Sequence, residues 1–197
     1  MAIQSVEISC PKCDAPVSVG QETCEWCHSP VTISTFNSVY DMPMPMVNKY
    51  ASVYRKALAE HPDNQTLNNS VAMCYLKLKL YDKALPAFEK AMEDNFDNSE
   101  TFFYAAICLL EGKKAFLHQR ATIDKIIEYI NAANMIEPKG IYYYFLAYIK
   151  YDYFKRKFLN TTPNYSDLLK TAIAQGLSKN DVEQLYAILG VERPAEL

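Results

Sequence analysis

The sequence has little of what a turn-rich β-protein, a membrane-spanning protein or a nucleic-acid-binding protein requires. It contains only 5 glycines against 15 tyrosines and 9 phenylalanines, and this balance favours helices with aromatic packing over a β-fold with many turns. No apolar run approaches the roughly 18 residues that a membrane span needs. The formal net charge of −3 gives the chain no general attraction to nucleic acid or to an anionic membrane.

The sequence also lacks a secretory signal and a catalytic motif. Its start, MAIQSVEISCPKC, has neither a basic segment nor an apolar one, so we expect a cytoplasmic location, where cysteines stay reduced and available to metals. There is no glycine-rich phosphate loop and no Ser-His-Asp arrangement. The histidines number three, and His28, His61 and His118 fall in different segments. We therefore expect no enzymatic activity and no small-molecule substrate.

What the sequence does have is a pair of CxxC motifs near its start. They are Cys10-Pro-Lys-Cys13 and Cys24-Glu-Trp-Cys27. Two residues between the cysteines of each pair let both thiolates turn toward one ion. A segment this short cannot bury enough apolar surface to fold by itself, so a metal held by all four cysteines would stabilise it.

Other readings of these cysteines are weaker. The segment from Cys24 to His28 also spells a c-type haem attachment motif, but this would need export and would leave Cys10 and Cys13 unexplained. A redox dithiol normally starts a helix in a βαβ pattern, which is missing here. Iron in place of zinc stays open because four thiolates hold either metal. His28 could replace a cysteine ligand, although a solvent-facing histidine after the second CxxC is expected.

From about Val6 to Ile33 the chain resembles the zinc-ribbon family, with its rubredoxin-like knuckles. The resemblance implies one structural Zn²⁺ bound by Cys10, Cys13, Cys24 and Cys27, with no open coordination position for catalysis. The segment from residue 1 to 37 carries one lysine against four acidic residues, so it is a poor phosphate ligand. Trp26 could stack on a base, but packing against the ribbon strands or the helices is the expected role.

A Pro/Met-rich segment follows the ribbon. It includes Asp41-Met-Pro-Met-Pro-Met46, whose alternate prolines predict an extended path rather than a helix. We therefore expect three parts: a zinc ribbon over residues 1–37, a linker over 38–48 and a helical domain over 49–197.

The helical domain contains an internal repeat. Two amphipathic helices are predicted between Asn64 and Phe96, with a break at Leu80–Tyr81. Shifting this pattern by 34 positions relates Cys74 to Cys108, which indicates two equivalent, half-buried helix residues rather than reactive thiols. The period and the alternation of alanine with aromatic residues resemble the tetratricopeptide repeat (TPR) family from about Val47 to Tyr153. The resulting fold class is mostly α: a TPR-like α-solenoid of antiparallel helix hairpins with a small N-terminal β zinc ribbon.

Later parts of the domain are less regular. A long helix is predicted around Ile123 to Ile136, and another from about Ile141 to Phe158. Two capping helices follow. The first is expected to start at Ser166 or Asp167 and to end at Gly176, and the second to be capped by Ser178 with Asp181 and to end at Gly190. These last helices also fit a loose helix-turn-helix pattern, but they are not basic.

The TPR resemblance implies a concave groove that binds a peptide or a helix of a partner protein. By alignment, the groove residues are Asn69, Met73, Leu76, Lys77, Phe103, Ile107, Leu110, Glu111, Tyr143, Ala147 and Tyr151. The chain's own long helix or C-terminal hairpin could instead fill this groove. We predict a non-enzymatic adaptor or scaffold that binds a protein partner through the groove and uses the ribbon as a second contact. The alternative is a nucleic-acid-binding regulator that uses the ribbon and the C-terminal helix pair.

Overall fold

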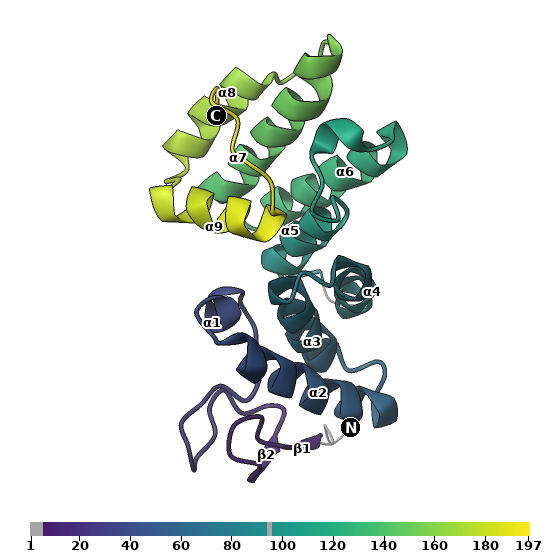
Figure 1. The fold of residues 1–197 in the computed structure, drawn as a ribbon, viewed down its shortest axis with the longest axis vertical. Helices are drawn as coiled ribbons and strands as arrows, with labels where there is room; N and C mark the ends of the chain where they lie inside the picture. The colour runs from purple at the N-terminus through teal and green to yellow at the C-terminus, as the bar shows by residue number, and fades with distance from the viewer. Residues whose placement is uncertain (1–5, 94–95) are drawn as a thin grey trace. The chain divides into compact units, whose positions relative to one another are not determined.

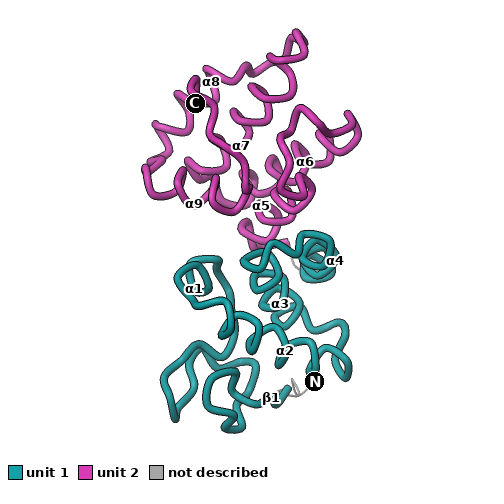
Figure 2. Tube along the Cα trace, viewed as in Figure 1, with its two compact units in different colours: residues 1–95 teal, residues 96–197 magenta. Residues whose placement is uncertain are grey.

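The computed structural model describes residues 6–93 and 96–197 (Figure 1). Residues 1–5 of the predicted ribbon and residues 94–95 of the predicted helical domain lie outside the described residues. The described part forms nine α-helices and one two-stranded sheet, so the expected fold class, mostly α with a small N-terminal β-structure, is confirmed. The chain divides into two compact units, Met1–Asn95 (unit 1) and Phe96–Leu197 (unit 2) (Figure 2).

Unit 1 begins with the small β-structure. Strands β1 (Glu7–Ser9) and β2 (Pro16–Ser18) pair antiparallel, with Ile8 opposite Val17. Apolar side chains at alternate positions of these strands face inward. Two more buried apolar side chains, Val31 and Ile33, follow the second CxxC motif, although the described residues form no third strand there. The buried apolar residues of this segment are Ile8, Val17, Val19, Val31 and Ile33.

Only the second half of the segment with alternate prolines is helical: residues 41–43 form a turn, and residues 44–46 begin a helix, which corrects the expectation of an extended path throughout. A short helix, α1 (Asn37–Tyr40), precedes it, and α2 (Met44–Glu60) begins within it. Pro43 is the residue before the first helical position, and Pro45 lies in the first turn of α2. The backbone N–H groups of a first turn have no partner inside the helix, so proline is tolerated there. Proline starts this helix instead of preventing it.

The central hairpin of unit 1 agrees with the sequence. Helices α3 (Gln65–Lys77) and α4 (Tyr81–Met92) are separated by three residues and pack on each other. The Asn64 side chain accepts a hydrogen bond from the backbone N–H of Leu67 and thereby caps α3. The predicted inward faces are buried, including Val71, Ala72, Ala84, Phe88 and Ala91. Helix α2 packs on α3 from the other side.

Unit 2 is built around helix α7 (Gly140–Ile149), which continues into a π-helical turn (Lys150–Phe154) and a 3₁₀ turn (Lys155–Lys157). Helices α5 (Ser99–Cys108) and α6 (Arg120–Ile136) pack together, and α6 also contacts α7. A 3₁₀ turn (Ala115–Leu117) lies in the connection between α5 and α6. Among the described residues, no helix is both long enough and apolar enough to cross a bilayer.

The two C-terminal helices pack against α7. Helix α8 (Tyr165–Ala174) starts earlier than expected because Asn164 caps it by accepting a hydrogen bond from the backbone N–H of Asp167. Helix α9 (Lys179–Leu189) has the predicted capping box of Ser178 and Asp181. It also ends as predicted at Gly190, which has a φ of 67°.

Candidate functional site

The first CxxC motif forms a tight knuckle at the end of strand β1. The backbone N–H of Cys10 donates to the carbonyl oxygen of Ala15 at 2.7 Å, and the N–H of Asp14 donates to the carbonyl of Cys10 at 3.0 Å. Asp14 takes a left-handed conformation, with φ of 63°. This turn brings the Cys10 and Cys13 thiols to the same side of the backbone.

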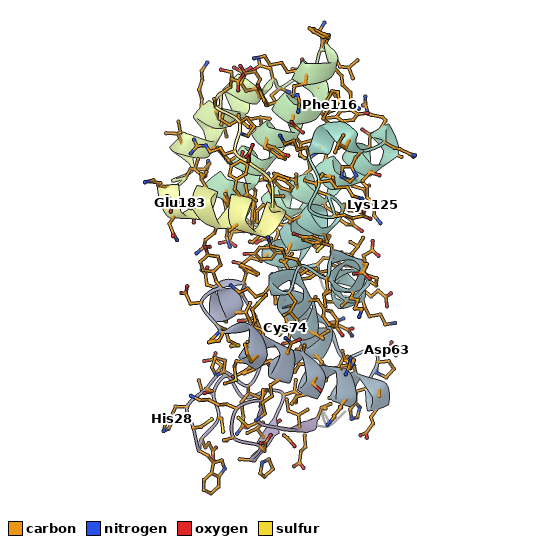
Figure 3. All side chains as sticks on the ribbon, in the orientation of Figure 1. His28, Asp63, Cys74, Phe116, Lys125 and Glu183 are labelled. Atoms are coloured by element: carbon orange, nitrogen blue, oxygen red, sulfur yellow. The ribbon has the colours of Figure 1, made fainter. Side chains whose placement is uncertain are left out.

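The second CxxC motif repeats the same backbone pattern. The N–H of Cys24 donates to the carbonyl oxygen of Ser29 at 2.9 Å, and the N–H of His28 donates to the carbonyl of Cys24 at 2.8 Å. His28 corresponds to Asp14 of the first knuckle and is also left-handed, with φ of 55°. Aspartate and histidine are among the residues that tolerate this conformation best. His28 is therefore a turn residue, and its side chain is exposed to solvent (Figure 3).

The two knuckles bring all four thiols together. The four Sγ atoms lie within 4.8 Å of one another. The Cys10–Cys27 Sγ distance is 3.6 Å and the Cys13–Cys24 Sγ distance is 3.7 Å. A tetrahedral ion with metal–sulfur bonds of about 2.3 Å has sulfur–sulfur edges of about 3.8 Å, whereas a disulfide bond is about 2 Å long. All four cysteines are free, and their spacing fits one tetrahedral ion.

Burial and charge also suit a metal ion. Cys10 and Cys24 are fully buried, while Cys13 is exposed and Cys27 half-buried. A backbone hydrogen bond from Ser29 lowers the pKa of the Cys27 thiol to about 6. Although a backbone hydrogen bond from Ala15 lowers the pKa of the Cys13 thiol, desolvation and the three neighbouring thiols outweigh that bond and raise this pKa to about 12. The thiolate, not the thiol, is the metal ligand. The four cysteines can therefore hold a metal ion and, with every position of a tetrahedron filled by protein, would leave none for substrate or water.

Trp26 lies between the two cysteines of the second knuckle, and its environment corrects one expectation. Its side chain is 75 % exposed, so it packs neither against the ribbon strands nor against the helices. Glu25, the other residue between these two cysteines, is exposed as well, whereas Cys24 is buried. Trp26 is thus presented to solvent on a backbone that is fixed at both ends.

The groove residues predicted on α3 interact with an earlier segment of the same chain. Asn69 is buried, and its Nδ2 donates to the carbonyl oxygens of Ile33 and Ser34 at 3.2 and 3.4 Å. The Lys77 ammonium donates to the carbonyl of Tyr40 and lies 4.9 Å from the centre of that ring. The other two predicted residues, Met73 and Leu76, are fully buried.

Ser70 completes this contact and is the residue that sequence reasoning missed. Its Oγ accepts a hydrogen bond from the N–H of Ile33 at 2.9 Å and lies 3.3 Å from the carbonyl oxygen of the same residue. Helix α1 also packs on α3. Two side chains of α3 thus hold the backbone at Ile33 as they would hold a bound peptide. A small polar residue inside an otherwise apolar helix face was the one signal in the sequence.

The groove residues predicted in unit 2 are mostly in its core. Phe103 packs against Tyr142 and Phe145, with ring centres 4.6 and 5.7 Å apart. The ring centre of Tyr151 lies 5.3 Å from that of Tyr165 in α8. The fully buried members are Ile107, Leu110 and Ala147, whereas Tyr143 is half-buried and Glu111 is exposed. The C-terminal hairpin of α8 and α9 packs on α7, so both faces of α7 are covered within unit 2.

Comparison with known proteins supports the helical fold. A solved structure of MamA AMB-1 is 17% identical in sequence, with a TM-score of 0.52, and the match covers 75% of this chain and 84% of that one. This likeness supports a TPR-like fold for the helices. A structure of MamA MSR-1 is also 17% identical, with a TM-score of 0.45 over 77% of this chain and 83% of that one; the fold argument rests on the first structure. No known family model matches the sequence, and neither does any curated protein.

Proposed function

We propose that this chain is a non-enzymatic protein-interaction scaffold, and that its metal-stabilised ribbon presents Trp26 as an anchor for a partner protein. The exposure of Trp26, 75 % of its side chain, carries the proposal. Tryptophan is enriched among the few residues that dominate binding energy at protein interfaces. A TPR-like helical domain, which is the fold supported by the MamA AMB-1 structure, commonly serves as such a scaffold.

We propose that the metal is a single structural Zn²⁺ bound by Cys10, Cys13, Cys24 and Cys27. The Sγ–Sγ distances of 3.6 and 3.7 Å support one tetrahedral ion, and four thiolates are a usual ligand set for structural zinc. Binding would stabilise the ribbon in the conformation that exposes Trp26, because a preformed site rarely exists in the unfolded chain.

The peptide-binding groove stays a prediction. Its residues on α3 already hold the chain's own segment from Ile33 to Tyr40, and those on α7 are covered by α8 and α9. A partner peptide or helix would have to displace the segment after the ribbon to reach α3, or the C-terminal hairpin to reach α7. We therefore assign the main contact to the ribbon and a second contact to the groove.

Affinity purification of the full chain tests the proposal. Wild type, Trp26→Ala and Met135→Ala are compared by quantitative mass spectrometry, with Met135 as a matched control because it is 87 % exposed. We expect a defined partner whose recovery falls more than about tenfold with Trp26→Ala, since truncating such an anchor typically costs 2 kcal/mol or more. Equal recovery with all three proteins would rule out Trp26 as the anchor.

A second measurement separates the scaffold from a nucleic-acid-binding regulator. Trp26 lies beside Glu25, and Glu7, Asp14 and Glu22 are also exposed on the ribbon. Lys49 of α2 pairs with Asp14 at 3.1 Å, which leaves the other carboxylates to repel phosphate. We expect no salt-sensitive binding of single-stranded DNA or RNA. Such binding, lost with Trp26→Ala, would favour the regulator.

A further inference from the structure

A solvent-filled pocket in unit 2 has no role in the scaffold function. It has a volume of about 530 Å³ and lies where the chain turns from the end of α7 into α8. Its lining includes two lysines, two threonines, two asparagines and a tyrosine, together with two apolar residues at the turn. The lining residues used below are Lys150, Lys155, Phe158, Leu159, Thr161 and Tyr165.

Lys150 is a buried cation without a counter-ion in this pocket. It is only 9 % exposed, and its Nζ donates to Thr161 Oγ1 at 2.6 Å. Within the part of the chain that the structure describes, no carboxylate lies within ion-pair distance of Lys150; the Asp124 carboxylate, whose charge also acts on Lys150, is paired with Arg120 at 2.8 Å. Burial lowers the pKa of its ammonium group, because an ion loses hydration there. An anion in the pocket would supply the missing charge partner.

More cations follow in the next turn, and aromatic rings fix their positions. The Lys155 ammonium donates to the Tyr165 hydroxyl at 3.0 Å. Arg156 lies 4.5 Å from the ring centre of Phe116 (labelled in Figure 3), and Lys157 lies 3.8 Å from that of Tyr153. Such cation–π contacts hold long side chains in place. The cationic cluster consists of Lys150, Lys155, Arg156 and Lys157.

Two carboxylates face this cluster and do not neutralise it. Asp152 is buried and accepts hydrogen bonds from the N–H of Phe116 at 2.8 Å and from Arg156 at 2.6 Å. A hydrogen bond from Tyr151 lowers the pKa of the Glu196 carboxyl, and the nearby charges of Lys155 and Arg156 lower it further. Four cations against two carboxylates leave a local positive charge. The net charge of −3 does not cancel it, since charges more than about 8 Å away are screened at physiological salt.

The turn beside the pocket exposes apolar side chains. Phe158 is 95 % exposed and Leu159 is 43 % exposed. Phe158 adopts a left-handed conformation with φ of 56°, which is unusual for a bulky aromatic residue, and it ends the helical segment there. A fully exposed phenylalanine next to a cluster of cations is typical of proteins that insert an aromatic side chain at a membrane interface and bind anionic headgroups with lysine and arginine.

We propose that this turn is a peripheral membrane contact, in which the phosphate or carboxylate of an anionic lipid headgroup enters the pocket between Lys150 and Lys155 while Phe158 inserts at the bilayer interface. Lys150 and Thr161 bind the headgroup, and Arg156 and Lys157, which do not line the pocket, add to the positive charge beside it. A free phosphate ion or a phosphorylated peptide would use the same lysines but would give no reason for the exposure of Phe158 and Leu159. The lipid surface accounts for both the cations and the apolar tip.

Co-sedimentation of the full chain with vesicles tests this proposal. One set of vesicles is phosphatidylcholine alone and the other contains added phosphatidylserine. We expect binding to the anionic vesicles only. Phe158→Ser should lower the partition coefficient by at least about tenfold, since burying a phenylalanine contributes roughly 1.5–3 kcal/mol. Lys155→Glu replaces a positive charge with a negative one and should lower the partition coefficient by a similar factor, because each charge near the surface contributes roughly 1 kcal/mol. Both residues are exposed, so both variants should fold.

Matched controls come from helix α8 of the same unit. Ile173 is 71 % exposed and the Lys170 side chain is 77 % exposed, so Ile173→Ser and Lys170→Glu change the same kinds of group away from the pocket. We expect near wild-type partition for both. Three results would overturn the proposal: no preference for anionic vesicles, equal losses in the control variants, or saturable binding of inorganic phosphate or a phosphopeptide without any vesicle binding.

Discussion

The hydroxyl of Tyr54 in α2 donates a 2.9 Å hydrogen bond to the carbonyl oxygen of Val31, just after the second knuckle. Tyr50, one helical turn earlier, makes the corresponding bond to Pro30 at 3.0 Å. Ser70 of α3 binds the backbone of Ile33. The segment that leaves the two knuckles is therefore fixed to the helices of unit 1, and this contact helps to hold the ribbon in place.

Removing the Tyr54 hydroxyl should destabilise unit 1. Both groups of the bond are buried, so Tyr54→Phe leaves the Val31 carbonyl without a partner, which costs about 1–3 kcal/mol. Urea unfolding measures the loss. Tyr143→Phe serves as the control, because Tyr143 is half-buried and its change should alter the free energy of unfolding by less than about 0.5 kcal/mol. Equal stability of wild type and Tyr54→Phe would contradict the structural role of this bond.

Metal content should depend on the four clustered cysteines alone. Elemental analysis of the purified chain is expected to find one zinc ion per chain, and Cys24→Ala should abolish it because three thiolates bind zinc far more weakly. Cys74→Ala is the control. Burial raises the pKa of Cys74 to about 12, so this thiol stays protonated and does not bind metal. Finding stoichiometric iron would show that the metal is iron instead of zinc, whereas finding no metal at all would contradict the proposed metal site.

Gly140→Ala should destabilise unit 2. A Cβ atom at Gly140 would lie 2.6 Å from the backbone nitrogen of Leu177 and 2.7 Å from the carbonyl oxygen of Ala172. Backbone atoms cannot move aside as side chains do, so we expect a loss of about 1–3 kcal/mol in urea unfolding. Gly20→Ala is the matched control, since a Cβ there meets nothing within 4 Å. Similar results for the two variants would show that α7 and the α8–α9 turn are not in close contact.

Unit 2 should lose stability on acidification through His118. Burial lowers the pKa of His118 below its ordinary value of 6.5, although its ring lies 3.0 Å from the carbonyl oxygen of Leu110. The folded state therefore favours neutral histidine. The stability is fully present above pH 6.5 and falls as the pH drops toward the folded pKa, where the unfolded chain binds a proton and the folded chain does not.

Thermal unfolding of wild type and His118→Gln over this pH range isolates the effect. The variant should lose less stability than wild type below pH 6.5, and acid effects on the thiol cluster should be common to both proteins. Parallel pH profiles for the two proteins would mean that His118 does not titrate with a lowered pKa.

Local patterns in the sequence predicted the local structure well. The spacing of the CxxC pairs predicted the clustered thiols, and apolar periodicity predicted helices α3 and α4. Ser178 and Gly190 predicted both ends of α9. These features depend on groups close together in the chain. Pro45 was misread because a proline rule for helix interiors does not apply to a first turn.

Residues distant in the sequence were harder to place. The TPR resemblance assigned Asn69 and Lys77 to a groove, and the sequence could not show that Ile33 and Tyr40 bind them. Trp26 could have packed inward, and only its place in the folded knuckle determined its exposure. The sequence placed the cations around Lys150 in a predicted helix but gave no sign of a role for them.

By itself, then, the sequence determined the close approach of the four cysteines, the helical class and both ends of α9, because each follows from spacing along the backbone. Only the tertiary structure decided which helix faces are covered. The segment after the ribbon covers a face of α3, and the C-terminal hairpin covers a face of α7. Burial depends on which distant segments meet, and it is this that left Trp26 and Phe158 exposed.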